Sequence, residues 1–421
     1  QNAPHGNEDI MSPVAMGDRM DTPRAPFLSR RAFVKSAAFA GVGGAYLGGA
    51  HLYLKDDRWT PNRSFWVSRG REPVSAPLRG EREADLAIIG GGVTGLSTAV
   101  HALLRSPGLK VVLIEAEYAG YGATGRSGGV LGEGTEMGTP AGTGDNVAHV
   151  IEMIDRFGIG CDLERAPVAQ LDPYRYAVGL KRAAEGLGAS VREGSRVRAI
   201  EDGAPVVIRG DSFVLRAPKV VVATNGYTPK LGVAASRIFP IHTAAAVTVP
   251  VPREVLRAIP DSIHAMTSRE MYMWGRKAPG QRVLVGAGAK YFYDDGLFHR
   301  GDGFLFPALH RFLAKSFPAL AAYPFQHVWT GPMGCTTDQE PIIGTEGRTG
   351  SIIYCGGYTG HGLAMGTKAG SFLAGLLHGE APPAWMLRPT LDLPGEPLRY
   401  IGANLVINLM NLGLYSMAKH D

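Results

Sequence analysis

The sequence predicts an α/β protein of two domains, in which a Rossmann-like fold is joined to an α+β domain with a mostly antiparallel sheet. Three observations lead to this prediction. The 421 residues are 45% hydrophobic and 19% charged, which is enough for two buried cores. Residues 85–115 read as a buried strand, a glycine-rich turn, a helix and a second strand. Residues 236–324 contain three strand-like runs and one helix-like run.

The composition argues against several classes of protein. The net charge is +5, but lysine and arginine are mixed with acidic residues, so a nucleic-acid partner is not expected. Cys161, Cys335 and Cys355 form neither a CxxC pair nor a cluster with histidine, so no metal site and no disulfide framework are expected. The 57 glycines gather in short clusters, which favours loops that admit a large ligand close to the backbone.

Residues 1–54 resemble a twin-arginine export signal. Arg30 and Arg31 are followed by Phe33 and by an uncharged run that ends at Leu54. The pattern predicts a bacterial protein that is exported already folded, and that is periplasmic or anchored on the outer side of the inner membrane. The alternative is the basic start of an amphipathic helix. Whether the segment is removed stays open.

Two further segments flank the predicted domains. Residues 55–83 form a linker whose aromatic residues are expected to hold it against a domain surface, and these are Trp59, Phe65 and Trp66. Residues 381–421 form a tail with an amphipathic helix, in which asparagine recurs at helical spacing. This helix is expected to pack on the body of the protein, the alternative being peripheral contact with a membrane.

Residues 85–115 carry a dinucleotide-binding pattern. Gly90, Gly92 and Gly95 have the GxGxxG spacing between a strand and a helix, and the next strand ends in Glu115. The first glycine permits the tight turn, the second lets a diphosphate approach the backbone, and the third lets helix and strand pack closely. The helix N-terminus adds partial positive charge under the phosphates. Because Glu115 would accept hydrogen bonds from ribose hydroxyls, the expected ligand is FAD or NAD rather than NADP.

Residues 122–129, GATGRSGG, carry the next signal. With the turn before it, this segment resembles the FAD-dependent amino acid oxidase family (DAO-like), in the amine-oxidising branch similar to gamma-glutamylputrescine oxidase. The resemblance implies that the segment runs along the diphosphate and ribityl chain of the flavin, where its glycines admit backbone amides. It also implies that Arg126 pairs with the phosphates, with a solvated loop as the alternative.

Three later stretches extend the resemblance. Residues 219–229 resemble a family strand whose small residues lie over the dinucleotide, and Val197 resembles a valine whose backbone meets the adenine. Residues 354–362 resemble the closing motif of the family, which would aim a helix N-terminus at flavin N1 and the C2 carbonyl. A fold that binds NAD would not need this distal motif, so FAD is the expected cofactor. The cofactor-binding residues that the resemblance implies are Gly90, Gly92, Val93, Thr94, Gly95, Glu115, Ala116, Gly122, Ala123, Thr124, Arg126, Ser127, Gly128, Gly129, Val197, Ala223, Thr224, Asn225, Gly357, Tyr358, Thr359, Gly360, His361 and Gly362.

The resemblance also implies the chemistry. Hydride would leave the carbon next to the substrate nitrogen for flavin N5, the imine would be hydrolysed, and the electrons would pass to oxygen. Lys290 resembles a lysine that assists reaction with oxygen, with an ordinary strand-end lysine as the alternative. His361 would touch the flavin pyrimidine edge or cap the turn, and Tyr272 would face the substrate or belong to the core. Because Cys335 lies too near Asp338 to match the tethering cysteine of some relatives, the flavin is expected to be non-covalent.

The resemblance divides the chain into an FAD-binding domain, 84–235 with 325–380, and a substrate domain, 236–324. Family members usually have a longer run between Gly129 and the helix-like run near 171, which supplies strands of the substrate sheet, so a reduced pocket wall is expected. The expected substrate is a small-molecule amine or amino acid. Two alternatives stay open: a membrane-associated dehydrogenase that passes electrons to a quinone, and a non-catalytic FAD-bound subunit.

Overall fold

The computed structural model describes residues 63–165, 168–267, 272–291, 305–395, 397–399, 401–402 and 404–405. Contacts between Cα atoms divide the chain into Gln1–Leu47 and Gly48–Asp421, and every described residue belongs to the second unit. The predicted export signal, Trp59 and most of the predicted tail helix lie outside the described residues. Among the helices that are described, none is both long enough and apolar enough to cross a bilayer.

A six-stranded sheet lies at the centre of the nucleotide-binding fold, with the strand order β14-β15-β8-β2-β3-β4. Neighbouring strands are parallel except for β14 and β15. Every residue of β2 and β3 is buried because both faces of the sheet are covered, which explains the short, continuous apolar runs in the sequence. The strands are β2 (Leu86–Ile89), β3 (Val111–Ile114), β4 (Ser190–Arg192), β8 (Lys219–Val222), β14 (Ile342–Glu346) and β15 (Ile352–Gly356).

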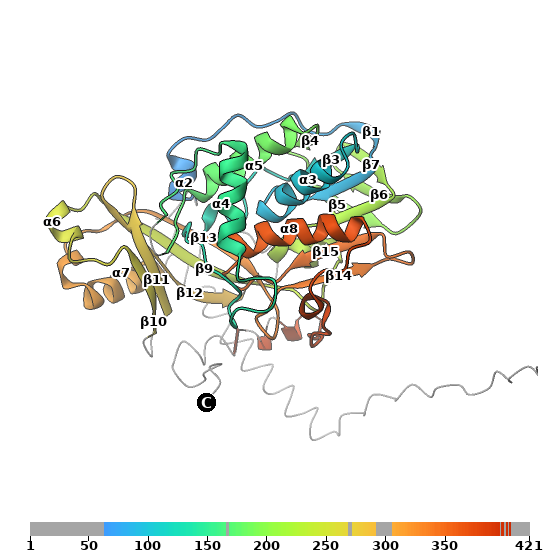
Figure 1. The fold of residues 1–421 in the computed structure, drawn as a ribbon. Helices are drawn as coiled ribbons and strands as arrows, with labels where there is room; N and C mark the ends of the chain where they lie inside the picture. Colours follow the sequence, from blue (N-terminus) through green and yellow to red (C-terminus); the bar gives the residue numbers. More distant parts are fainter. Residues whose placement is uncertain are drawn as a thin grey trace, which may run out of the picture. The chain divides into compact units, whose positions relative to one another are not determined.

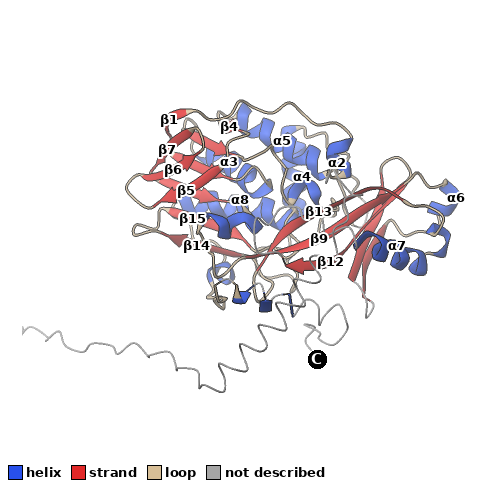
Figure 2. Cartoon of the chain, turned by 180° about the vertical axis from the view of Figure 1, so that it is seen from behind, coloured by secondary structure: helices blue, strands red, loops and turns tan. Residues whose placement is uncertain are grey.

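Helices cover one face of this sheet, and a second sheet covers the other (Figure 1 and Figure 2). On the helical face, Ile88 and Leu113 share a buried cluster with side chains of four helices. On the opposite face, Ala87 and Val112 pack against a four-stranded sheet of order β1-β7-β6-β5. These elements are α3 (Val93–Arg105), α4 (Asn146–Phe157), α5 (Pro173–Gly186), α8 (Ala364–Leu377), β1 (Gly80–Glu83), β5 (Val197–Glu201), β6 (Val206–Gly210) and β7 (Phe213–Ala217).

Local sequence explains where these helices begin and end. Asp172 caps α5, since its side chain accepts hydrogen bonds from the amides of Tyr174 and Arg175, both at 3.1 Å. α4 ends at Gly158, which has the left-handed conformation with φ 60°. The cap residue of α3, Gly92, has no side chain to accept a hydrogen bond, so the first N–H groups of this helix are left for another partner.

A five-stranded antiparallel sheet, of order β10-β11-β12-β9-β13, forms the second part of the structure. Helix α7 covers one face of it through a buried apolar cluster. The long strands β9 and β13 pair with each other and extend toward the nucleotide-binding fold (Figure 1). These elements are β9 (Phe239–Thr248), α6 (Arg253–Leu256), β10 (Ser262–Thr267), β11 (Tyr272–Ala278), β12 (Arg282–Tyr291), α7 (Leu305–Ser316) and β13 (Phe325–Cys335).

The predicted fold class, a Rossmann-like fold joined to a mostly antiparallel sheet, is confirmed. β13 belongs to the antiparallel sheet, although the sequence analysis places residues 325–335 in the FAD-binding domain. The other domain boundaries stay a prediction.

The linker is held as predicted at two of its aromatic residues. Phe65 and Trp66 are 5% and 1% exposed, and they lie in a cluster with α5 and with the antiparallel sheet. The remaining short elements are α2 (Phe65–Ser68), η2 (Thr124–Arg126), η3 (Asn225–Leu231), η5 (Pro318–Leu320) and η6 (Ala384–Leu387).

Candidate functional site

Four parallel strands end at one edge of the six-stranded sheet, and a predicted motif follows each of them. Gly90 follows β2, Glu115 follows β3, Ala223 follows β8 and Gly357 follows β15. The Gly90 amide donates to the carbonyl of Ile114 at 2.8 Å, which keeps the first two turns together. Ligands of open α/β sheets bind outside the carboxyl ends of the strands. Motifs that are far apart in the sequence therefore meet where a dinucleotide is expected.

The turn between β2 and α3 has the close packing that the GxGxxG spacing predicts. Gly90 has φ 114°, which is unfavourable for a residue with a side chain. A β-carbon at Gly95 would overlap the Gly90 carbonyl, so this glycine lets the helix pack on the strand. At the helix N-terminus, beside Gly92, the amide of Val93 donates to Thr124 Oγ1 at 3.2 Å. The N-terminus of α3 therefore faces the loop 122–129.

Glu115 is held beside this turn. Its carboxylate accepts hydrogen bonds from the amides of Gly91 (2.7 Å) and Glu117 (2.9 Å). Burial raises the pKa of Glu115 above its usual range, while the two amide hydrogen bonds act in the opposite direction. Backbone amides thus hold the carboxylate in place at the end of β3, and Ala116 follows it in the chain. Its contact with ribose stays a prediction.

Arg126 is buried, and its guanidinium joins the loop 122–129 to β13. Nε donates to the carbonyl of Tyr121 and Nη1 donates to the carbonyl of Thr330, both at 3.0 Å. The guanidinium carbon also lies 5.1 Å from the centroid of the Tyr121 ring. Arg126 is therefore not a solvated side chain. Its predicted pairing with phosphates stays a prediction, because the donors described here are directed at protein carbonyls.

The glycines of this loop also admit protein side chains. A β-carbon at Gly128 or at Gly286 of β12 would overlap the indole of Trp274, which lies against both residues. A β-carbon at Gly122 would lie 3.5 Å from the ring of Tyr227. The loop is therefore shaped by aromatic side chains from β11 and η3 as well as by its expected ligand.

The closing motif meets the ends of two other strands. The amide of Gly357 donates to Asn225 Oδ1 at 2.9 Å, and Asn225 itself has φ 47°. The amide of Thr359, which has φ 45°, donates to the carbonyl of Gly334 at 3.0 Å. The ends of β8, β13 and β15 are thereby joined around the predicted site.

Tyr358 links the same motif to the dinucleotide-binding helix. Its hydroxyl lies 2.8 Å from Thr94 Oγ1 and 3.1 Å from Cys355 Sγ. Burial raises the pKa of Tyr358 well above its ordinary value. The side chain of Tyr358 is therefore a buried contact between α3 and the turn before α8.

His361 faces a residue that the sequence analysis did not single out. Its Nδ1 lies 3.1 Å from Glu136 Oε2, and both side chains are 33% exposed. Next to Glu136, the hydroxyl of Thr135 donates to Glu340 Oε1 at 2.9 Å. A β-carbon at Gly132 would lie 3.5 Å from the His361 ring. The segment after the loop 122–129 therefore lies against the closing motif.

The other predicted residues are placed chiefly by the backbone. Tyr272 pairs with Thr267 at one end of β11, and Lys290 pairs with His242 after an irregularity in β12. The side chains of Tyr272 and Lys290 lie outside the described part of the structure, so their roles stay predictions. The remaining residues lie in the turns and strands already given: Ala123 and Ser127 flank η2, Val197 begins β5, Thr224 precedes η3, Gly129 ends the loop, and Gly360 and Gly362 flank His361.

Comparison with known proteins identifies the family. A model for the family described as DAO, FAD dependent oxidoreductase, matches residues 85–171 and 164–376. The chain belongs to this family. It is 27% identical over 396 residues to a probable oxidoreductase OrdL of Rhizobium meliloti (strain 1021), with 77% of this chain and 90% of that protein covered. It is also 27% identical over 387 residues to the gamma-glutamylputrescine oxidoreductase of Escherichia coli (strain K12), with 74% and 88% covered.

Solved structures show the same fold. A glycine oxidase from Geobacillus kaustophilus matches with a TM-score of 0.61 and 18% identity, covering 74% of this chain and all of that one. An L-proline dehydrogenase from P. horikoshii matches with a TM-score of 0.60 and 18% identity, covering 73% and 97%. Since the DAO family is FAD-dependent, this chain is an FAD-dependent oxidoreductase of the amine or amino acid oxidase kind.

The residues at the edge of the sheet suit the FAD of the DAO family. Gly92, the cap residue of α3, has no side chain over the helix N-terminus, so a diphosphate can approach the backbone there, beside Thr124. The hydroxyl of Tyr227 is buried beside Gly122 and has no hydrogen-bond partner among the described residues, so it offers a donor to a ligand. Cys335 is buried at the end of β13, and burial raises the pKa of its thiol to about 12, while non-covalent binding of the flavin stays a prediction.

The comparisons also bear on the length of this DAO-family chain, while the place of the expected shortening stays a prediction. Since 77% of 421 residues is fewer than 396, the alignment with the Rhizobium protein includes positions that this chain lacks. The family model matches in two stretches that meet at residues 164–171, next to the segment in question.

Sequence analysis missed several neighbours of the site. Glu136 stands in a turn and Tyr227 in the short helix η3, where no periodic pattern marks a side chain that points inward. The sequence pattern predicts Trp66 only as an anchor of the linker, and Trp274 lies two residues from Tyr272 in the same strand. Two features of the sequence could have pointed to these tryptophans: an aromatic residue in the linker, and glycines at positions 128 and 286 that leave room for a large side chain.

Proposed function

We propose that this protein oxidises the C–N bond of a small-molecule amine or amino acid. The observation that carries the proposal is the convergence of the four strand-end motifs of a DAO-family chain at one edge of the sheet. The relatives named above, an amine oxidoreductase and an amino acid oxidase among them, support the substrate class. FAD, when bound, would accept hydride at N5 from the carbon next to the substrate nitrogen, and water would then hydrolyse the imine.

The residues of this chain would orient substrate and set the electrostatics. His361 stands three positions before α8, so the helix N-terminus and the imidazole approach the same place. Glu136 Oε2 lies 3.1 Å from His361 Nδ1, so a carboxylate stands beside the ring at this place. We assign oxygen as the electron acceptor and Lys290 as the cation that assists it, on the strength of the family resemblance alone.

Two other functions compete with this one. A non-catalytic FAD-bound subunit is favoured by the positions that this chain lacks relative to the Rhizobium and Escherichia coli proteins. A dehydrogenase that passes electrons to a quinone would use the same flavin site. Export through a twin-arginine signal would suit either enzyme, and changing Arg30 and Arg31 to lysine should then retain the protein inside the cell.

An anaerobic titration tests these functions against each other. Purified protein with FAD is mixed with a panel of primary amines, secondary amines and amino acids while the flavin absorbance is followed. An oxidoreductase is expected to bleach with at least one member of the panel, and an oxidase is expected to recover colour and form peroxide when air is admitted. Recovery only with a soluble quinone would identify the dehydrogenase. Bound flavin that no member of the panel reduces would leave the non-catalytic subunit.

A further inference from the structure

Side chains from three different elements hold carbonyl groups of the loop 122–129. The donors come from the linker helix α2, from β13 and from β11, and each makes a hydrogen bond to a different loop residue. The pairs are Trp66 Nε1 with the Ser127 carbonyl (2.8 Å), Trp329 Nε1 with the Arg126 carbonyl (2.9 Å), and Arg276 Nη1 with the Gly129 carbonyl (3.1 Å).

These hydrogen bonds set the direction of the loop amides. In a trans peptide, the N–H of the following residue points opposite to the carbonyl. Since the Ser127 carbonyl points at Trp66 and the Gly129 carbonyl points at Arg276, the amides of Gly128 and Val130 point away from these donors. Neither amide has a hydrogen-bond partner in the part of the chain that the structure describes. Two N–H groups are thus presented by a loop whose glycine pattern indicates contact with flavin.

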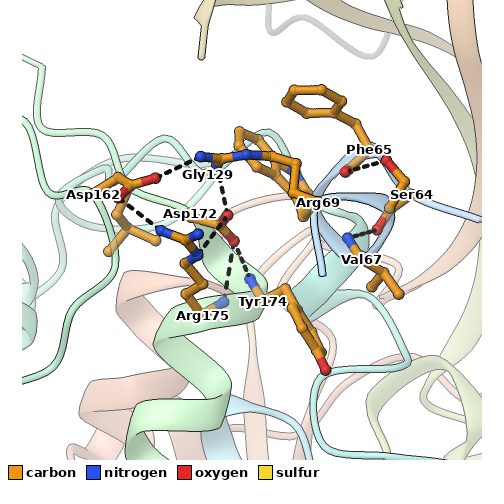
Figure 3. A network of polar contacts seen from close by, with 12 residues as sticks. Ser64, Phe65, Val67, Arg69, Gly129, Asp162, Asp172, Tyr174 and Arg175 are labelled. Atoms are coloured by element: carbon orange, nitrogen blue, oxygen red, sulfur yellow. Dashed lines mark hydrogen bonds and ion pairs between the residues drawn. The ribbon is translucent and has the colours of Figure 1, made fainter. Parts of the chain in front are cut away.

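Trp66 is held in a fixed position, so it can hold the Ser127 carbonyl in one direction. Trp66 is 1% exposed, and the guanidinium of Arg276 lies 5.3 Å from its ring centroid. Figure 3 shows how Arg69, the residue after α2, ties this helix down: its Nη1 lies 2.9 Å from Asp172, and its Nη2 lies 2.9 Å from Asp162. Ser64 accepts a hydrogen bond from the amide of Val67 at the other end of α2 (Figure 3).

We propose that Trp66 is a positioning residue for the flavin: by holding the Ser127 carbonyl, it turns the Gly128 amide toward the bound FAD. The linker, which precedes the nucleotide-binding fold in the sequence, is then a part of the cofactor site rather than a spacer. This inference rests on the FAD dependence of the family and not on the reaction proposed above.

The Trp66→Phe variant of the full chain tests the proposal, because it keeps an aromatic ring and removes the indole N–H. FAD is stripped, then titrated back while flavin fluorescence is followed, and the absorption spectrum and midpoint potential of the reloaded protein are recorded. The dissociation constant for FAD is expected to rise about tenfold, with a changed flavin spectrum or potential. Trp329→Phe is expected to act in the same direction.

Trp385→Phe is the matched control, since it removes an indole hydrogen bond of similar length, 2.9 Å, to the Ala141 carbonyl. Its FAD affinity and flavin spectrum are expected to match those of the wild type. The proposal is overturned if Trp66→Phe, folded by its circular dichroism, also keeps the wild-type affinity, spectrum and potential.

A measurement on the wild-type protein covers the case in which Trp66→Phe does not fold. If docking of the linker favours FAD binding, FAD must favour docking of the linker to the same extent. Hydrogen exchange at the amides of α2 is therefore expected to slow when FAD binds. Unchanged exchange in α2, together with new protection in the loop 122–129, would refute the proposal. Neither experiment depends on turnover, so a negative result here leaves the proposed reaction standing.

Discussion

The carboxylate of Glu115 accepts a hydrogen bond from the amide of Gly91 at 2.7 Å, at the point where β3 meets the glycine-rich turn. A buried carboxylate is costly unless it is hydrogen-bonded, and this one is bonded by backbone groups only. The arrangement opposes stability but offers acceptor oxygens beside the expected ribose. We therefore expect Glu115 to lower the stability of the FAD-free protein and to increase its affinity for FAD.

Glu115→Gln is expected to show this separation. Because burial raises the pKa of Glu115, the folded protein binds more protons than the unfolded chain just above the unfolded pKa of 4.5. The contribution of Glu115 to stability therefore falls as the pH rises through that region, and the variant lacks this loss. Urea unfolding of the FAD-free proteins should show that the free energy of unfolding of the variant increases relative to that of the wild type as the pH rises. The affinity of the variant for FAD should be weaker. A pH-independent difference between the two proteins would contradict the argument.

Gly128→Ala should disturb the cofactor loop through a steric contact. The added β-carbon would overlap the Trp274 indole. This indole also lies against Gly286, so it cannot easily move away. The expected cost in the free energy of unfolding is about 1–3 kcal/mol, together with loss of bound flavin. Gly186→Ala in α5 is the control, because a β-carbon there meets no atom within 4 Å. Its melting temperature should equal or exceed that of the wild type.

The pair of histidines between α3 and α4 should make the protein sensitive to acid. His101 Nε2 lies 3.2 Å from His149 Nε2, and burial together with the charge of His149 lowers the pKa of His101 to about 4. Arg105, Arg156 and Lys368 act in the same direction.

Between pH 4 and the ordinary pKa of 6.5, the unfolded chain binds more protons at His101 than the folded protein does. The free energy of unfolding should therefore rise with pH across this window, by up to about 3 kcal/mol. His101→Gln should flatten the dependence between pH 4 and pH 7 when unfolding is measured from pH 4 to pH 8. Equal slopes for variant and wild type in that range would disprove the assignment, and the interval from pH 7 to pH 8 serves as the internal reference.

Lys181→Met should be strongly destabilising. Lys181 Nζ lies 2.6 Å from Glu193 Oε2 in a buried pair, and Glu193 also accepts hydrogen bonds from the amides of Ser75 and Ala119. Removal of the lysine would leave the carboxylate buried without its counter-charge, at a cost of about 3–5 kcal/mol. Chemical denaturation measures the change. The exposed pair of Arg198 and Asp211 provides the comparison, since Arg198→Gln should change stability little.

Much of the fold could be predicted because local sequence carries it. The buried strands β2 and β3, the glycines between β2 and α3, and Glu115 at the end of β3 all follow from short patterns whose physical demands are local. The antiparallel second sheet was also predictable from its strand-like runs. The pairing of β13 with β9 could not be predicted, because a strand's partner is not set by its neighbours in sequence.

Some features of the candidate site could likewise be predicted from the sequence, and others could not. The sequence by itself determined that the chain belongs to an FAD-dependent family, because the glycine spacing indicates a dinucleotide site and residues 122–129 and 354–362 resemble motifs of that family. Only the tertiary structure decided that Arg126 reaches β13, that Glu136 faces His361, and that Trp66 holds the loop carbonyl. Such contacts join residues from distant segments through side chains whose direction depends on the packing of whole sheets and helices, and no local pattern records that packing.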